Sequence, residues 1–230
     1  MKKIVVLSGA GVSAESGLQT FRDSNGLWNN YNVEDVASIE GWHKNKALVL
    51  EFYNMRRREL EKVQPNEAHR IIASLERDFN LCVVTQNVDN LHERAGSSHV
   101  IHLHGELTKA CGERDKEHPL EIGYRDIELG EKAPDGTQLR PFIVWFGEAV
   151  PLLERAAREV STADILIIIG TSLNVYPAAG LVHYTRPDCR IYLIDPKPIP
   201  LALNNFVQIK EKATVGMQKL ASILENLLKG

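Results

Sequence analysis

The chain alternates between short apolar runs and longer stretches with apolar residues at helical spacing. The apolar runs, several of them β-branched, predict buried strands at 2–7, 81–84, 100–101, 142–146, 165–169 and 190–194. The amphipathic stretches predict helices at 43–63, 67–77, 151–160 and 215–228, with a further helix that ends at Thr185. Strands that alternate with helices along the chain predict an α/β fold with a doubly wound parallel sheet, similar to a Rossmann fold.

The segment from Glu106 to Arg140 has a different character. It contains the charge-rich stretch GERDKEHP and the turn sequence APDG, and its hydrophobic periodicity is weak. We therefore expect a single domain of 230 residues with a small, loop-rich insert module. The Rossmann-like part would comprise about 1–30, 66–105 and 141–230. The small module would combine the helical insert, about 31–65, with the loop-rich insert, about 106–140.

Composition narrows the class of protein. A hydrophobic content of 43% and a charged content of 25% are ordinary for a globular chain. The net charge of −3 gives no general attraction to nucleic acid or to an anionic membrane, and no apolar run is long enough to span a bilayer. Cys82, Cys111 and Cys189 are widely separated and form no CxxC pair. We expect a cytoplasmic protein without a nucleic-acid or membrane partner.

A glycine-rich turn follows the first predicted strand and opens a helix. Gly9 and Gly11 would let the backbone approach a diphosphate, and the free N–H groups of the helix would face it. The spacing GxGxxxxxG departs from the dehydrogenase pattern GxGxxG, and a tight turn without a ligand is the alternative. Phe21 and Arg22, in the polar loop that follows, would form a lid over the ligand or would be ordinary surface residues.

Polar side chains gather after two strands that we expect to be neighbours. Gln86, Asn87 and Asp89 follow the strand 81–84, and His104 follows the strand 100–101. Ligands of open α/β sheets bind outside the carboxyl ends of the strands, so these side chains would face one crevice. His102 precedes His104 by two residues, and of these two histidines we expect His104 to be the functional one. A pair of solvated polar loops is the alternative interpretation.

Tyr53 and Arg56 lie three residues apart in the predicted helix 43–63, and hence on one side of it. Arg56 is also four residues before Leu60, at the edge of the apolar stripe rather than opposite to it. The alternative for the run Arg56-Arg57-Arg58 is a solvated basic surface.

Together these motifs resemble the sirtuins, NAD-dependent protein lysine deacylases. The resemblance spans nearly the whole chain, and the motifs occur in the order that the family has. They are Gly9-Ala10-Gly11-Val12-Ser13, Ser16-Gly17, Phe21-Arg22, Thr85-Gln86-Asn87-Val88-Asp89, His104-Gly105, Val144-Trp145-Phe146-Gly147-Glu148, Gly170-Thr171-Ser172 and Val175-Tyr176-Pro177.

The resemblance implies a role for each matching residue. His104 would be the general base, which deprotonates a ribose hydroxyl after the acyl oxygen has attacked the ribose carbon that nicotinamide leaves. The NAD-binding residues would be Gly9, Ala10, Gly11, Ser13, Phe21, Arg22, Gln86, Asn87, Asp89, Gly170, Thr171, Ser172 and Asp195. The acylated lysine of a protein substrate would contact Tyr53, Arg56, Val144, Trp145, Phe146, Gly147, Val175 and Tyr176. The backbone of Phe146 and Gly147 would pair with the substrate as an added strand.

Tyr53 and Arg56 also match a Tyr-x-x-Arg pair of the succinyl-preferring sirtuins. A succinyl or malonyl group ends in a carboxylate, which a phenol and a guanidinium bind through charge-assisted hydrogen bonds. An acetyl group would leave the guanidinium unpaired in an apolar tunnel. The resemblance therefore implies a desuccinylase or demalonylase with residual deacetylase activity.

Two positions depart from the pattern of the family. Most sirtuins bind a structural zinc through four cysteines in the small module, whereas Cys111 is the one cysteine of that segment here. We therefore expect a module without zinc and no metal ligands. Asp195 stands where an Asn is common near the adenine ribose, and it would disfavour a 2′-phosphate, so NAD rather than NADP is expected. We also expect a monomer.

Four other functions share parts of this pattern. An NAD-dependent oxidoreductase fits less well, because the glycine spacing is not that of dehydrogenases. A mono-ADP-ribosyltransferase would trap the same ribose cation with a protein nucleophile. A plain deacetylase and a non-catalytic NAD-binding module complete the alternatives.

Overall fold

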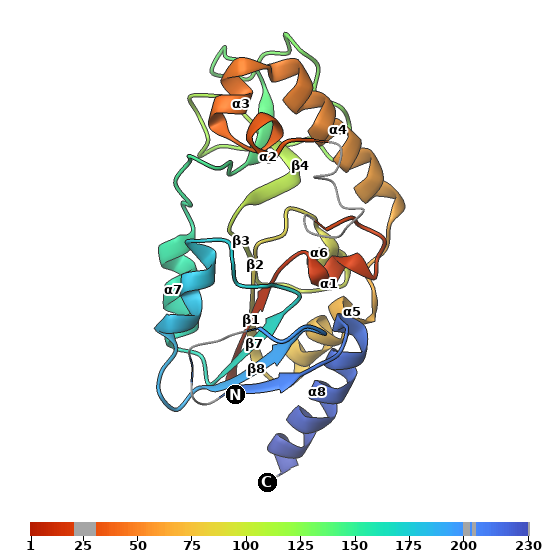
Figure 1. Ribbon diagram of the computed structural model, residues 1–230, viewed down its shortest axis with the longest axis vertical. Coiled ribbons are helices and arrows are strands. Elements are labelled where there is room, and N and C mark those ends of the chain that lie inside the picture. Colours follow the sequence, from red (N-terminus) through yellow and green to blue (C-terminus); the bar gives the residue numbers. More distant parts are fainter. Residues whose placement is uncertain (21–30, 200–202, 204–205, 230) are drawn as a thin grey trace.

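A parallel sheet forms the larger part of the computed structural model, which describes residues 1–20, 31–199, 203 and 206–229 (Figure 1). Within these residues the sheet has six strands in the order β3-β2-β1-β7-β8-β9. They are β1 (Lys3–Ser8), β2 (Asn80–Thr85), β3 (Val100–His102), β7 (Ile165–Ile169), β8 (Arg190–Ile194) and β9 (Phe206–Ile209). Every neighbouring pair is parallel, which confirms the predicted α/β fold class.

Helices cover both faces of this sheet (Figure 1). On one face lie α5 (Glu67–Ser74), the 3₁₀ helix η2 (Leu75–Arg77) and α8 (Ala213–Lys229), and on the other lie α7 (Leu153–Ser161) and the 3₁₀ helix η3 (Ala178–Tyr184). Successive side chains of a strand point to opposite faces, so Val6 packs in the first core and Val5 in the second. Burial on both faces explains why these strands are almost continuously apolar in sequence.

Within the described residues, the smaller unit carries an antiparallel sheet and three helices. Its strands, in the order β5-β4-β6, are β5 (Leu120–Glu121), β4 (Gly105–Cys111) and β6 (Arg140–Ile143). Its helices are α2 (Val33–Val36), α3 (Ile39–Lys44) and α4 (Lys46–Lys62). A separate core joins them and includes Trp42, Phe52, Leu107 and Trp145.

Two details differ from the sequence prediction. The strand expected at 142–146 ends at Ile143, and it pairs with β4 in the small sheet rather than with the parallel sheet. The single helix expected at 43–63 is divided at Asn45, whose side-chain oxygen accepts a hydrogen bond from Leu48 N at 3.1 Å and thereby caps α4. The cap fixes where α4 begins and hence which side chains face the small core.

The last strand of the sheet, β9, was not predicted. Phe206, Val207 and their neighbours lie at a half-exposed edge, so no continuous apolar run marks them in the sequence. None of the helices within the described residues has the length and apolar character needed to cross a membrane.

Candidate active site

Two tight turns meet at the carboxyl edge of the parallel sheet, one after β1 and one after β7. Gly9 N donates to Ile169 O at 3.0 Å and Gly11 N donates to Gly170 O at 2.8 Å. A Cβ atom on Gly9 would lie 2.7 Å from Cβ of Thr171, and one on Gly170, whose φ is +62°, would lie 2.3 Å from Val12 N. These glycines are therefore required by turn-to-turn packing, a reason that the sequence pattern did not reveal.

Behind these turns a buried polar cluster links the start of α1 (Gly11–Ala14) to the loop after β2. Ser13 Oγ donates to Asp89 Oδ2 at 2.9 Å and accepts from Asn87 Nδ2 at 3.2 Å. Asp89 Oδ1 also accepts from Leu91 N at 3.1 Å. Burial raises the pKa of the Asp89 carboxyl, although the hydrogen bonds from Leu91 and Ser13 act in the opposite direction. The three predicted residues Ser13, Asn87 and Asp89 thus form one connected group.

The same edge brings β2 and β7 together through side chains. Gln86 Nε2 donates to Thr171 Oγ1 at 3.0 Å, and Ser172 follows Thr171 directly. Asp195, at the end of β8, accepts a hydrogen bond from Lys197 N at 2.8 Å. The predicted residues after β1, β2, β7 and β8 therefore lie at neighbouring strand ends, because the strands are parallel and adjacent.

His104 lies directly before β4 and beside the loop that follows β2. Its Nδ1 is 3.0 Å from the carbonyl oxygen of Gln86, which can only accept, so Nδ1 carries the hydrogen and Nε2 is the free acceptor. Burial lowers the pKa of His104, while the hydrogen bond to Gln86 partly offsets this effect. The ring is half-buried and neutral at pH 7, which suits a proton acceptor.

His102 occupies a different environment. Its Nδ1 lies 3.0 Å from Asn87 O and its Nε2 lies 2.7 Å from Glu93 Oε1, so both ring nitrogens have partners. Burial alone would lower the pKa of His102, but the hydrogen bond and the charge of Glu93 outweigh it and raise the pKa. This arrangement fixes the loop of Asn87 rather than exposing a basic nitrogen.

Two further buried histidines, His69 and His92, lie beside this polar cluster. The sequence analysis did not identify His69. His92 Nε2 lies 3.0 Å from Ser8 Oγ, His69 Nε2 lies 3.5 Å from Ser13 Oγ, and the two rings are 4.9 Å apart. Burial lowers the pKa of His69 to about 4. The signal in the sequence was Asn66, since His69 three residues later completes a capping box at the start of α5.

Tyr53 and Arg56 lie together inside the smaller unit. Their exposed fractions are 4% and 8%, so the alternative of a solvated basic run fails for Arg56. Arg57 is also buried and donates to Arg125 O, whereas Arg58 pairs with Glu51 and Asp126 on the surface. Burial lowers the pKa of Arg56, and Tyr53, Glu59 and Asp89 act against it.

The segment that follows β6 packs against the helices of the smaller unit. Trp145 is 2% exposed and lies in the small core, where its indole N–H donates to Tyr53 Oη at 3.0 Å. It therefore contacts Tyr53 within the small core. Phe146 is 54% exposed, but its N–H donates to Ala37 O and its carbonyl accepts from Ile39 N. The backbone of Phe146 therefore pairs within this chain, whereas the expected pairing of Gly147 with a substrate strand stays a prediction.

The remaining predicted residues are placed as follows. Val144 N donates to His104 O at 3.0 Å, which ties this segment to the candidate base. Tyr176 is exposed and lies before η3. Phe21 and Arg22 lie outside the described residues. Across the part of the chain that the structure describes, no three His, Cys, Asp or Glu side chains converge in the manner of a metal site.

Comparisons with known proteins agree on one family. The model of the Sir2 family matches residues 9–177. A protein of Bacteroides thetaiotaomicron named NAD-dependent protein deacylase is 56% identical over 230 residues, covering 97% of this chain and 98% of the relative. A solved complex of a Sir2 homologue with NAD has a TM-score of 0.89 and 41% identity, covering 99% of this chain and 91% of that one. A Sir2 complex with a deacetylated p53 peptide and 3′-O-acetyl ADP ribose has a TM-score of 0.80 and 29% identity, covering 96% and 92%.

Proposed function

The chain belongs to the Sir2 family and is an NAD-dependent protein deacylase, and from this premise we propose that it prefers acidic acyl groups, succinyl or malonyl, on protein lysines over acetyl. The observation that carries the proposal is the burial of Tyr53 and Arg56 side by side in α4. A phenol and a guanidinium that lie on one side of a helix can bind one carboxylate through charge-assisted hydrogen bonds. A succinyl or malonyl chain ends in such a carboxylate, whereas an acetyl group ends in a methyl.

The residues at the carboxyl edge of the parallel sheet fit a dinucleotide. Ser13, Asn87 and Asp89 offer hydroxyl, amide and carboxylate groups suited to sugar hydroxyls and an amide, and the tight turns at Gly9 and Gly170 bring backbone close to them. We assign the NAD site to these residues together with Gln86 and the predicted Ala10, Gly11, Thr171, Ser172 and Asp195. When bound, NAD supplies the ribose carbon that receives the acyl oxygen as nicotinamide departs.

The proton transfer and the orientation of the substrate would depend on residues of the chain itself. His104 accepts a proton from a ribose hydroxyl at Nε2, because Nδ1 is held by Gln86 O. The lowered pKa keeps this nitrogen unprotonated at pH 7. Asn87 and Asp89 stay in place because Ser13 and the backbone of Leu91 bond them. Arg56 and Tyr53 orient the far end of an acidic acyl chain by charge-assisted hydrogen bonds.

We also propose that the small unit functions without zinc. Cys111 is the one cysteine between residues 106 and 140. Its thiol is buried, and burial raises its pKa to about 11, which disfavours the thiolate that zinc requires. The interior is instead filled by Trp42, Trp145 and the ion pair of Arg140 with Glu148.

The experiment compares kcat/KM for acetyl- and succinyl-lysine peptides of one sequence, with NAD present. Arg56→Met should lower the succinyl value by about 10-fold to 100-fold, since a charge-assisted hydrogen bond contributes about 1.5–3 kcal/mol, and should leave the acetyl value nearly unchanged. Arg58→Met is the matched control, because Arg58 lies two residues further along α4 and faces the surface. His104→Ala should abolish turnover of both peptides.

Two results would count against the proposal. If wild type prefers the acetyl peptide and Arg56→Met changes neither value, the protein is a plain deacetylase. If neither peptide reacts while label from NAD appears on protein, mono-ADP-ribosylation replaces deacylation as the activity of this site.

A further inference from the structure

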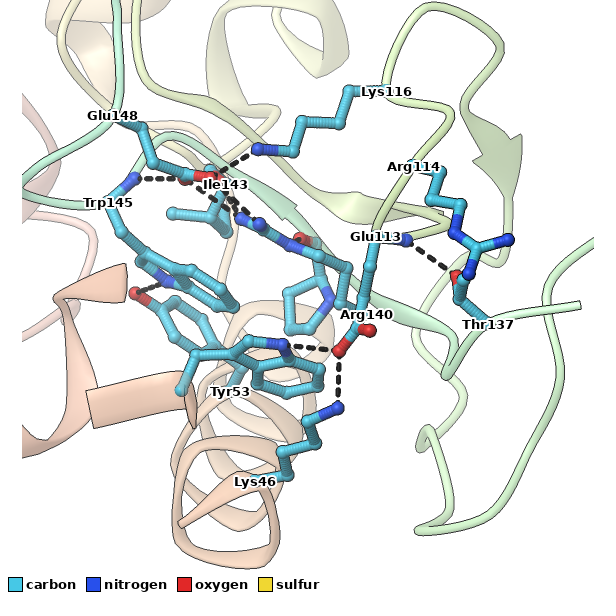
Figure 2. Close-up of polar contacts among 12 residues, drawn as sticks. Lys46, Tyr53, Glu113, Arg114, Lys116, Thr137, Arg140, Ile143, Trp145 and Glu148 are labelled. Atoms are coloured by element: carbon cyan, nitrogen blue, oxygen red, sulfur yellow. Dashed lines mark hydrogen bonds and ion pairs between the residues drawn. The ribbon is translucent and has the colours of Figure 1, made fainter. Parts of the chain in front are cut away.

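A buried series of contacts leads from Glu148 to Tyr53 in the smaller unit (Figure 2). The carboxylate of Glu148 accepts from the two terminal nitrogens of Arg140 at 2.8 and 2.9 Å and from Lys116 Nζ at 2.5 Å. It also accepts from the backbone N–H of Trp145 at 2.9 Å. Glu148 therefore fixes both the guanidinium of Arg140 and the main chain of Trp145.

Arg140 in turn fixes the ring of Trp145. Its guanidinium carbon lies 3.6 Å from the centre of the indole ring, and its Nη2 donates to Ile143 O at 2.7 Å. The ring of Trp42 packs against the same indole with ring centres 5.2 Å apart. A cation that is buried against an aromatic ring and paired with a carboxylate holds that ring more firmly than apolar packing does. Trp145 thus has little freedom to rotate.

The indole N–H of Trp145 donates to Tyr53 Oη at 3.0 Å. A phenol that accepts in this contact still carries its own hydroxyl hydrogen, and that hydrogen is available to an acceptor elsewhere. Burial raises the pKa of Tyr53 to about 12, so the phenol keeps this hydrogen at neutral pH. Arg56 lies on the next turn of the same helix. The phenol and the guanidinium can therefore donate to one anion.

We propose that Trp145 is a positioning residue for acyl selectivity: by donating to Tyr53 it directs the phenol hydrogen toward the terminal carboxylate of the acyl chain. The ion pair of Arg140 and Glu148 keeps the indole in the orientation that this requires. The inference rests on the proposed preference for acidic acyl groups. It predicts that the contribution of Trp145 is confined to substrates that end in an acceptor, because an acetyl methyl cannot receive the hydrogen.

The test is a double-mutant cycle with Trp145→Phe and Tyr53→Phe, assayed on succinyl- and acetyl-lysine peptides. Phenylalanine keeps an aromatic ring at residue 145 but has no N–H. Trp145→Phe should raise KM for the succinyl peptide by about threefold to tenfold, the effect of one neutral hydrogen bond, and leave kcat and the acetyl kinetics within about twofold. In the Tyr53→Phe background the same change should have no further effect on the succinyl peptide.

Trp42→Phe is the matched control for a loss of ring volume in this core. The indole of Trp42 is also buried, but its N–H donates to Glu113 Oε1 at 2.7 Å rather than to Tyr53. It should therefore leave the ratio of succinyl to acetyl activity unchanged even if it lowers the melting temperature.

The outcomes separate this inference from the proposed function. If wild type prefers succinyl but the effects of Trp145→Phe and Tyr53→Phe multiply, the positioning role of Trp145 is refuted and the acyl preference stands. Equal losses on both peptides after Trp145→Phe would likewise reduce Trp145 to a packing residue. If wild type prefers acetyl, the proposed function fails and the inference falls with it.

Discussion

Replacing Glu148 by Gln keeps the size of the side chain but removes the negative charge that faces Arg140 and Lys116. The Glu148 side chain is 10% exposed and that of Arg140 is 2% exposed, so solvent screens their ion pair weakly. Burial alone would raise the pKa of Glu148, yet the hydrogen bonds and charges of Arg140 and Lys116 and the N–H of Trp145 lower it from 4.5 to about 2. The difference between these two pKa values determines how much stability the substitution should cost.

At about 1.4 kcal/mol for each pH unit between about 4.5 and about 2, the ionised carboxylate contributes about 3 kcal/mol to the free energy of unfolding. The pKa is lower in the folded state, so this contribution is complete above about pH 4.5 and is lost as the pH falls toward about 2. Glu148→Gln should therefore cost about 3 kcal/mol at pH 7 and about 2 kcal/mol at pH 3.5. A buried Arg140 without a counter-charge is expected to cost a similar amount, about 3–5 kcal/mol.

The assay is urea unfolding followed by tryptophan fluorescence, since Trp42 and Trp145 lie beside the ion pair. Glu51→Gln is the matched control, because Glu51 pairs with Arg58 on the surface and should contribute less than about 1 kcal/mol. A loss below about 1 kcal/mol at pH 7 after Glu148→Gln, or an equal loss at pH 7 and pH 3.5, would refute the reasoning.

Three further predictions address the active site and the small unit. Because burial lowers the pKa of His104, the acidic limb of kcat/KM against pH should lie below pH 6.5, and a limb above pH 7 would contradict its assignment as the base. Gly9→Ala brings a Cβ within 2.7 Å of Cβ of Thr171. Thermal unfolding should show a loss of about 1–3 kcal/mol, and calorimetry a weaker affinity for NAD, whereas an unchanged melting temperature would contradict the packing argument. Treatment with a chelator should change neither activity nor melting temperature, and elemental analysis should find no stoichiometric zinc; a loss that zinc alone restores would show that Cys111 belongs to a metal site after all.

The sequence pattern predicted the parallel sheet and most of its edge residues for a local reason. Strands that are buried on both faces are continuously apolar, and the polar residues that follow them mark where each strand ends. Because β2 and β3 are parallel neighbours, the loop that carries Gln86 must come close to His104. The contact of 3.0 Å between them follows from this register rather than from any motif.

The smaller unit was harder to predict because its stability depends on contacts between distant parts of the chain. Tyr53 and Trp145 are 92 residues apart, and nothing local indicates that the indole donates to the phenol. The indole of Trp42 donates to Glu113, which is 71 residues away in the sequence. The strands β4 and β6 pair with a shift in register between Glu106 and Ala110, which weakens the alternating pattern on which strand prediction relies.

For the basic run of residues 56–58, the simplest interpretation, a solvated surface, is wrong at two of the three positions. Arg56 and Arg57 stand in a basic run that is usually a solvated surface, yet both are buried while Arg58 is not. Helical spacing assigned Arg56 to the edge of the apolar stripe, and this was the better guide. Burial of Arg57 depends on the carbonyl groups of Arg125 and Leu107, which lie outside α4.

The most direct test of the account is a competition experiment in which the protein, with NAD, receives equal amounts of acetyl- and succinyl-lysine peptides of one sequence. The ratio of the two products gives the ratio of the kcat/KM values. The account predicts that succinyl is removed faster by wild type and that Arg56→Met brings the ratio toward or below one, while Arg58→Met leaves it unchanged. Faster removal of acetyl by wild type would contradict the assignment of Tyr53 and Arg56 to an acidic acyl group.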